Sequence, residues 1–383
     1  MGPLHGIKII EMAGIGPGPM AAMLLADLGA TVIRIDRATP SNLGIDRPLK
    51  YNFTFRNRKC VPLDLKAAGA AELVLKLVEQ ADGLIEGFRP GVMERLGLGP
   101  DVCLTRNPRL IYGRMTGWGQ TGPMANAVGH DLNYIALSGT LGFIGREGQP
   151  PTPPLNVIGD MGGGALYLAL GMVAAMMEAR QSGKGQVVDA AITDGAASLA
   201  SSVFGLNAGG QWNAARGTNI LDSGSYFYDL YECADGKWLS VGAIEKKFHD
   251  ELFRLLGMNP VDYPPQSDQS SWKKMKGILG AKFKEKTRDE WVAHFGDAEV
   301  CVAPLLSAEE AAVHPHNKAR GTFVEIDGVL QPAPAPRFSR TQADLPDPPQ
   351  PMNDENSLAA LGEWLDSEDA GAWLAASKGK PAI

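Results

Sequence analysis

Two kinds of hydrophobic pattern alternate along the first half of the chain. Short, nearly continuous apolar runs are typical of buried strands, whereas longer segments with apolar residues three or four positions apart are typical of helices. The strand-like runs lie at residues 6–12, 30–37, 59–66, 83–91, 108–119 and within 181–192, and the helix-like segments lie at 19–29, 67–82 and 160–180. This alternation predicts parallel strands joined by right-handed crossovers, and therefore an α/β fold with an open, doubly wound, Rossmann-like sheet.

The pattern changes after about residue 198. Residues 225–243 read as a hairpin whose turn is Asp235-Gly236. Amphipathic helices are predicted over 245–257 and 270–287, and the proline-rich segment 331–351 is predicted to be an extended connection. We expect four parts: a large Rossmann-like domain (1–200), a linker (201–225), a small α+β domain (226–330), and a proline-rich linker with a C-terminal segment that returns to the large domain (331–383).

Composition and charge exclude several classes of partner. The 383 residues are 44% hydrophobic and 21% charged, and the net charge of −7 gives no general attraction for nucleic acid. The four cysteines are widely separated, so we expect neither a disulfide framework nor a zinc site, and no other metal site. The apolar tracts are interrupted by Gly, Ser and charged residues, so no membrane span is expected. The N-terminus lacks the pattern of a signal peptide, which favours the cytoplasm.

A glycine-rich loop follows the first predicted strand. Residues Gly14 to Pro19 read GIGPGP and open a helix, and Asp36 ends the next strand, which is the context of a dinucleotide-binding fingerprint. The third glycine of that fingerprint, which lets helix and strand pack closely, is replaced by Pro19. We therefore interpret this loop as a turn rather than as a site for NAD.

Basic residues gather near the predicted ends of the strands. The basic positions are Arg37, Arg56, Arg58, Lys59, Lys66, Arg89 and Arg95. Ligands of open α/β sheets bind at the carboxyl ends of the strands, and guanidinium groups recognise phosphate through paired hydrogen bonds. The cluster is compatible with a polyphosphate ligand and equally with a solvated charged face.

Three ionisable residues stand at predicted helix starts. They are His130, which follows Gly129, Asp160, which precedes three glycines, and Glu245, which follows a strand. The positive end of a helix dipole disfavours imidazolium, so a histidine there is a competent base, and the free N–H groups of the same helix end could stabilise an enolate. The glycines after Asp160 are expected to leave backbone space for a substrate. Each of the three residues is also explained by an ordinary capping role.

Methionines recur on two of the predicted helices. Met172, Met176 and Met177 follow Asp160, and Met20 and Met23 lie on the first helix. At helical spacing such residues are typical of a core, although flexible thioethers could also accommodate varied acyl chains.

Several segments together resemble a known family. These are GIKIIEMAGIGPGPMAAMLLADLGATVIRIDR, NPRLIYGRMTGWGQTGP, GHDLNYIALSG, GDMGGGALYLALGM, SGKGQVVDAAITDG and YECADGKWLSVGAIE. They resemble the α-methylacyl-CoA racemases, which belong to the family III CoA-transferase superfamily (CaiB/BaiF type). The resemblance runs in order from Leu4 to about Phe323 and weakens in the proline-rich tail.

The resemblance implies a site, residue by residue. His130 matches the catalytic histidine, Asp160 the opposing catalytic aspartate and Glu245 the carboxylate that partners the histidine, while the main-chain N–H of Asp131 would hold the thioester oxygen. The matching CoA-contacting positions are Arg37, Leu63, Asp64, Leu65, Lys66, Gly87, Phe88, Arg89 and Arg95. The positions that line the thioester run from Gly129 to Tyr134 and include Asn133.

The resemblance also implies how these residues are used. Members of the family form an interlocked homodimer with each active site between the large domain of one subunit and the small domain of the other. They use no metal or separate cofactor, because CoA is part of the substrate. The implied reaction interconverts (2R)- and (2S)-2-methylacyl-CoA through an enolate.

Two alternatives stay open at this point. On the same fold, a CoA transferase would use Asp160 as a nucleophile that forms an acyl anhydride. A protein that binds CoA without catalysis is a second possibility. Transferases generally lack the pairing of histidine and glutamate, so His130 with Glu245 favours the racemase.

Overall fold

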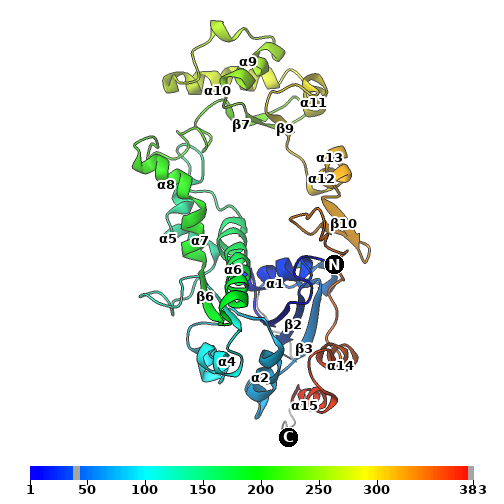
Figure 1. The fold of residues 1–383 in the computed structure, drawn as a ribbon. Coiled ribbons are helices and arrows are strands. Elements are labelled where there is room, and N and C mark those ends of the chain that lie inside the picture. The colour runs from blue at the N-terminus through cyan, green and yellow to red at the C-terminus, as the bar shows by residue number, and fades with distance from the viewer. Residues whose placement is uncertain (38–43, 378–383) are drawn as a thin grey trace. The chain divides into compact units, whose positions relative to one another are not determined.

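The fold was obtained as a computed structural model that describes residues 1–37 and 44–377 (Figure 1). The chain forms two compact units. The first comprises Met1–Ser138, Leu155–Leu199 and Lys318–Ile383, and the second comprises Gly139–Pro154 and Ala200–Asn317.

Six parallel strands form the centre of the first unit, as predicted. Their order is β3-β2-β1-β4-β5-β6, and every neighbouring pair is parallel. The strands are β1 (Lys8–Met12), β2 (Thr31–Asp36), β3 (Arg58–Pro62), β4 (Gly83–Glu86), β5 (Ile111–Thr116) and β6 (Gln186–Ala191). The order reverses between β1 and β4, which is the switch point where ligands bind in doubly wound sheets.

Helices cover both faces of this sheet (Figure 1). Those of the first unit are α1 (Pro17–Asp27), α2 (Ala70–Gln80), α3 (Val92–Arg95), α4 (Pro100–Arg106), α5 (Asp131–Leu137), α6 (Tyr167–Ser182), α7 (Ile192–Leu199), α14 (Asp354–Gly362), α15 (Ser367–Ser377), the 3₁₀ turns η1 (Leu49–Tyr51) and η2 (Phe53–Phe55), and the π-helix η4 (Val157–Leu166). Neighbouring strand residues point to opposite faces, so Ile9 packs with α1 and α6 whereas Ile10 packs with α2, α14 and α15. The C-terminal segment thus returns to the sheet, where the Trp373 indole N–H donates to the Pro62 carbonyl at 2.9 Å.

The predicted helix over residues 160–180 is in fact two elements. The chain enters the π-helix η4 at Val157 and continues as α6 from Tyr167, so Asp160 lies inside the first turn of η4 and not at a helix cap. The joined segment Val157–Ser182 is long and apolar enough to cross a membrane by length and composition. Its buried side, with Met172 and Met176, packs on the sheet as a core helix does.

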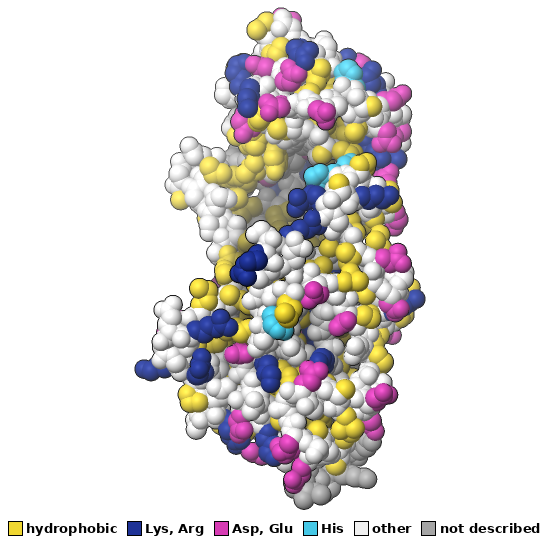
Figure 2. All heavy atoms as spheres, turned by 45° about the vertical axis from the view of Figure 1, so that its right-hand side comes forward, with side chains coloured by type: hydrophobic (Ala, Val, Ile, Leu, Met, Phe, Trp, Pro, Cys, Tyr) yellow, Lys and Arg dark blue, Asp and Glu magenta, His cyan; other side chains and the backbone are white. Residues whose placement is uncertain are grey.

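The second unit is built on the predicted hairpin. Strands β7 (Tyr228–Glu232) and β8 (Trp238–Gly242) are antiparallel, and β9 (Val302–Pro304) pairs with β8. The other elements are η3 (Thr140–Phe143), α8 (Ser201–Ala208), α9 (Lys246–Leu255), η5 (Pro260–Asp262), η6 (Gln269–Ser271), α10 (Trp272–Phe283), α11 (Arg288–Phe295), α12 (Ala308–Val313) and α13 (Pro315–Arg320), the last of which ends in the first unit. Acidic and basic side chains are intermingled over most of the face drawn in Figure 2.

The structure groups two segments differently from the sequence pattern. Residues 139–154 belong to the second unit, where Arg216 donates to the main chain of Gly142 and Gln149. The antiparallel pair β10 (Phe323–Ile326) and β11 (Val329–Pro332) belongs to the first unit, where the buried Gln331 side chain accepts a hydrogen bond from Arg56 at 3.1 Å. Long-range polar contacts of this kind leave no local signal in the sequence.

Buried ion pairs connect the strands of the first unit. Glu11 on β1 is fully buried and faces Arg34 on β2 in register. Its carboxylate is paired with both Arg34 and Arg58, the latter with 3.0 Å between Arg58 Nε and Glu11 Oε2. On the other side of the switch point, Arg114 Nε lies 3.0 Å from Glu86 Oε1. Because each carboxylate is paired with a guanidinium, these polar side chains can be buried in the sheet.

We predict that Glu11→Gln destabilises the protein by about 3–5 kcal/mol, because it leaves the buried Arg58 guanidinium without its counterion and Arg34 with Asp36 alone. Urea unfolding of the two proteins measures the difference. The control is Glu363→Gln, which removes an exposed partner of Lys59 and should cost about 1 kcal/mol or less. Equal stability of the Glu11 and Glu363 variants would contradict the prediction.

Candidate active site

His130 is the N-cap residue of α5. Its backbone is extended, its N–H donates to Asn133 Oδ1 at 3.0 Å, and its carbonyl accepts from the Asn133 N–H at 2.8 Å. The main-chain polar groups are therefore engaged in starting the helix, while the imidazole is exposed. Since the first N–H groups of a helix have no partner within it, donors of the main chain lie beside the histidine.

Tyr134 fixes the loop that carries the histidine. Its hydroxyl donates to the Gly129 carbonyl, and its ring packs edge-on against Trp118 with 4.7 Å between centroids. A Cβ atom at Gly129 would lie 2.7 Å from the tyrosine ring, and one at Gly117 would overlap it. The glycine before His130 is thus required by packing.

Asp160 lies beside the glycine-rich loop. Its Oδ2 is 3.4 Å from Asn156 Nδ2, and it would be 3.0 Å from a Cβ atom at Gly16, which has φ 68°. Burial raises the pKa of the Asp160 carboxyl, the nearby Asp131 carboxylate raises it further, and His130 opposes that shift. Both predicted bases belong to the first unit, and the residue after His130 contacts the main chain of Asp160.

Asp131 links the two halves of this site. Its side chain is 7% exposed, and Oδ1 accepts a hydrogen bond from the Asp160 main-chain N–H at 2.6 Å. Burial raises the pKa of the Asp131 carboxyl, while the N–H groups of Asp160 and Gly159 lower it. The start of α5 and the first turn of η4 are therefore joined through a carboxylate.

The glycines after Asp160 serve packing and not substrate space, which corrects the sequence interpretation. A Cβ atom at Gly163 would lie 2.6 Å from the Ala196 main-chain N, and one at Gly195 would overlap the Gly163 carbonyl. At Gly164 it would lie 3.0 Å from Pro17. These contacts let η4 approach α7 and α1 with backbone against backbone.

The predicted CoA positions follow three strands, of which β3 and β2 are neighbours and β4 is separated from β2 by β1. Arg37 follows β2, residues 63–66 follow β3, and residues 87–89 follow β4, with Arg95 in α3. Because these strands are parallel, all of them lie at the carboxyl edge of the sheet, as the pattern predicted. Arg37, Lys66, Arg89 and Arg95 are exposed. Leu63, in contrast, is only 1% exposed and packs in the core.

Two other arginines of the basic cluster have structural roles. Arg56 is 2% exposed and pairs with Asp27 at 2.5 Å, and Arg58, also 2% exposed, pairs with Glu11. Neither guanidinium is available to a phosphate or to solvent, so neither of the two interpretations of the basic cluster applies to these residues.

Comparisons with known proteins show the family and the fold. Residues 4–357 match CoA-transferase family III. The chain is 41% identical to α-methylacyl-CoA racemase of Mus musculus over 96% of this chain and 94% of the relative, and 42% identical to that of Homo sapiens over 89% and 87%. A CaiB/BaiF family protein from Brucella suis has the same fold, with a TM-score of 0.80, 24% identity, and coverage of 95% of this chain and 100% of the other.

The chain belongs to CoA-transferase family III.

The third predicted ionisable residue of this family III chain lies in the second unit. Glu245 is the exposed N-cap residue of α9, with an extended backbone. Burial raises the pKa of the nearby Cys301 thiol, and the charge of Glu245 raises it further. His130 and Asp160 belong to the first unit, so the pairing of Glu245 with His130 stays a prediction.

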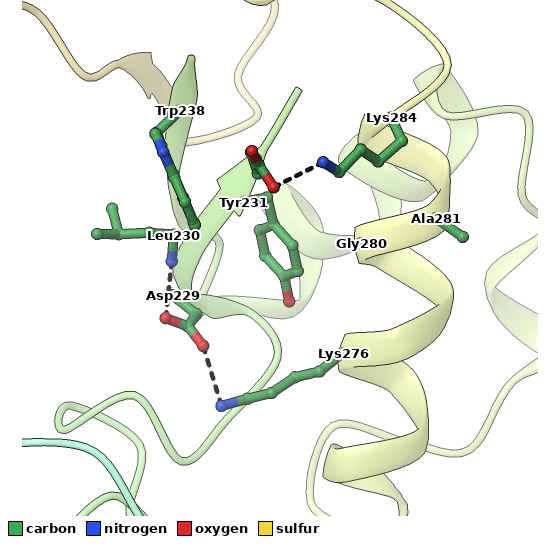
Figure 3. A pocket seen from close by; sticks show the side chains of 9 residues that line it. Asp229, Leu230, Tyr231, Trp238, Lys276, Gly280, Ala281 and Lys284 are labelled. Atoms are coloured by element: carbon green, nitrogen blue, oxygen red, sulfur yellow. Dashed lines mark hydrogen bonds and ion pairs between the residues drawn. The ribbon is translucent and has the colours of Figure 1, made fainter. Parts of the chain in front are cut away.

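A separate pocket in the second unit has a different character (Figure 3). It has a volume of about 480 Å³ and lies between the hairpin and α10. Its two lysines are occupied: Lys276 Nζ is 3.0 Å from Asp229, and Lys284 Nζ is 2.6 Å from Glu232. With its positive charges already paired, this pocket is not the expected phosphate site.

The methionines divide between core and surface. Met172 and Met176 are buried, and Met23 is 8% exposed, as expected for core residues, whereas Met177 is 62% exposed. The helical spacing in the sequence does not by itself distinguish the buried methionines from the exposed one.

Two residues beside Asp160 were missed by sequence reasoning. The loop containing Gly16 was interpreted as a plain turn, and Asn156 was not singled out. A usable signal existed for Gly16, because its loop follows β1 at the switch point of a doubly wound sheet.

We predict that Gly195→Ala destabilises the protein by about 1–3 kcal/mol, because the added methyl group forces α7 away from η4. Thermal and urea unfolding measure the loss. The matched control is Gly371→Ala on α15, where a Cβ atom meets nothing within 4 Å and the helix should gain about 0.5–1 kcal/mol. A stabilised Gly195→Ala variant would refute the close-packing argument.

Proposed function

We propose that the protein is a 2-methylacyl-CoA racemase, which inverts the α-carbon of a CoA thioester by removing and returning a proton. The observation that carries this proposal is the contact between the segments that bear the two bases: the carboxylate of Asp131, the residue after His130, accepts the Asp160 main-chain N–H at 2.6 Å. The near full-length similarity to α-methylacyl-CoA racemases supports it.

Two bases divide the reaction between two faces of the carbon. One base removes the α-proton, the electron pair moves into the thioester carbonyl as an enolate, and the other base, in its acid form, delivers a proton to the opposite face. His130 serves one face and Asp160 the other. Burial raises the pKa of Asp160, which makes its carboxylate a stronger base than an exposed aspartate.

The start of α5 stabilises the enolate. The main-chain N–H of Asp131 belongs to the first turn, beside His130, and donates to the thioester oxygen as negative charge develops there. Gly129, Asn133 and Tyr134 form the wall next to this oxygen.

The exposed cations at the strand ends bind CoA. Arg37, Lys66, Arg89 and Arg95 present four positive charges to the phosphates, and the main chain and side chains of residues 63–65, Gly87 and Phe88 hold the rest of the carrier. CoA is part of the substrate, so the reaction needs no separate cofactor.

A homodimer completes the site. On the segment from η4 to α6, Leu166, Leu170 and Met177 are 52%, 67% and 62% exposed and recur at helical spacing, which is an apolar face suited to a second subunit. In the interlocked arrangement, Glu245 of the partner subunit accepts the imidazole N–H of His130 and orients the ring.

The test follows one enantiomer of a 2-methylacyl-CoA in heavy water. We expect deuterium at the α-carbon together with inversion of configuration, and a loss of racemisation of about 100-fold or more in His130→Ala and in Asp160→Ala. The exposed His5→Ala variant is the matched control and should racemise normally. If His130→Ala racemised the substrate at the wild-type rate, the assignment of the two bases would be wrong.

The same incubation, with a free carboxylic acid added, separates the racemase from a CoA transferase. A transferase would move CoA to the added acid through an anhydride on Asp160, without label at the α-carbon. A protein that only binds CoA would do neither.

A further inference from the structure

The Asp131 side chain is directed away from the helix that it starts. It is 7% exposed, and its Oδ1 accepts the Asp160 main-chain N–H at 2.6 Å. A Cβ atom at Gly159 would overlap the same oxygen, so this contact also requires a glycine at that position. Its second oxygen, Oδ2, is buried and accepts no hydrogen bond from the part of the chain that the structure describes. All polar contacts found for this carboxylate are thus made with the turn that bears Asp160.

That turn has no side-chain cap of its own. Asn156 precedes η4, but its side chain makes no capping hydrogen bond to the helix. In a π-helix the main-chain bonds span five residues, as in the bond of 3.2 Å from the Met161 N–H to the Asn156 carbonyl, so donors in the first turn need another acceptor. The Asp131 carboxylate supplies this acceptor from a different helix.

The Asp160 side chain is held only weakly by its neighbours. Its hydrogen bond from Asn156 is long, at 3.4 Å. On the other side its Oδ2 faces Gly16, where a Cβ atom would lie 3.0 Å away. The orientation of its carboxylate therefore depends on where the main chain of η4 lies.

We infer that the Asp131 carboxylate is a positioning residue, which holds the first turn of η4 so that Asp160 faces the α-carbon. This inference rests on the proposed racemase function, and it assigns to the side chain of Asp131 a role separate from that of its main-chain N–H. Since the carboxylate acts through Asp160, it affects only the proton transfer on the Asp160 face.

The first test measures the main chain directly. Amide hydrogen exchange in peptides covering residues 157–166 should be about tenfold faster or more in Asp131→Ala, and intermediate in Asp131→Asn, whose amide oxygen still accepts a hydrogen bond. The matched control is Asp82→Asn, since Asp82 Oδ2 accepts the Lys8 N–H at 2.8 Å, and its effect should stay near Lys8. Unchanged exchange over 157–166 in Asp131→Ala overturns the inference, whatever the catalytic activity is.

The second test separates the two faces. Each enantiomer is incubated alone in heavy water, and the one whose α-proton exchange is lost in Asp160→Ala identifies the Asp160 face. Asp131→Ala should slow exchange of that enantiomer by about 10- to 100-fold, leave the other within about threefold, and be partly rescued in Asp131→Asn. Equal slowing of both enantiomers, or of neither, overturns the inference. Absence of exchange in the wild-type protein instead refutes the proposed function, and the amide exchange still decides the role of Asp131.

Discussion

The hydrogen bond of 2.6 Å between the Asp131 carboxylate and the Asp160 main-chain N–H fixes the geometry of the candidate site. The two proposed bases belong to different elements, since His130 caps α5 and Asp160 lies in the π-helix η4. Asp131 is the covalent neighbour of one base and the hydrogen-bond partner of the other. Any movement of η4 relative to α5 must break this bond or displace a buried carboxylate, and both are costly.

Packing of glycines against main chain makes this arrangement possible. Gly163 and Gly195 bring η4 and α7 within backbone contact, and Gly164 meets Pro17 of α1. The π-helix η4 therefore packs against α1 and α7, which follow the carboxyl ends of β1 and β6. Two-base catalysis needs each base to stay at a constant distance from the α-carbon of the substrate. A segment that is packed this closely has little room to move.

The arginines around the sheet divide into a buried group and an exposed group. Arg34, Arg56 and Arg58 are buried and paired with carboxylates, so they stabilise the strands. Arg37 and Arg89, which follow the carboxyl ends of β2 and β4, are exposed. The exposed cations have no such structural role, which suits the recognition of a polyphosphate carrier.

The amino-acid sequence by itself determined the parallel sheet, the hairpin at Asp235-Gly236 and the placement of His130 at a helix start, because alternating hydrophobic patterns and turn residues act locally. It did not determine the π-helix at Asp160, the packing role of Gly163, the burial of Arg58 or the contact from Asp131 to Asp160. Each of these features depends on atoms supplied by a segment far along the chain. The sequence around an arginine or a glycine is the same whether that residue faces a ligand or the backbone of another helix. The tertiary structure alone decided which of them would meet.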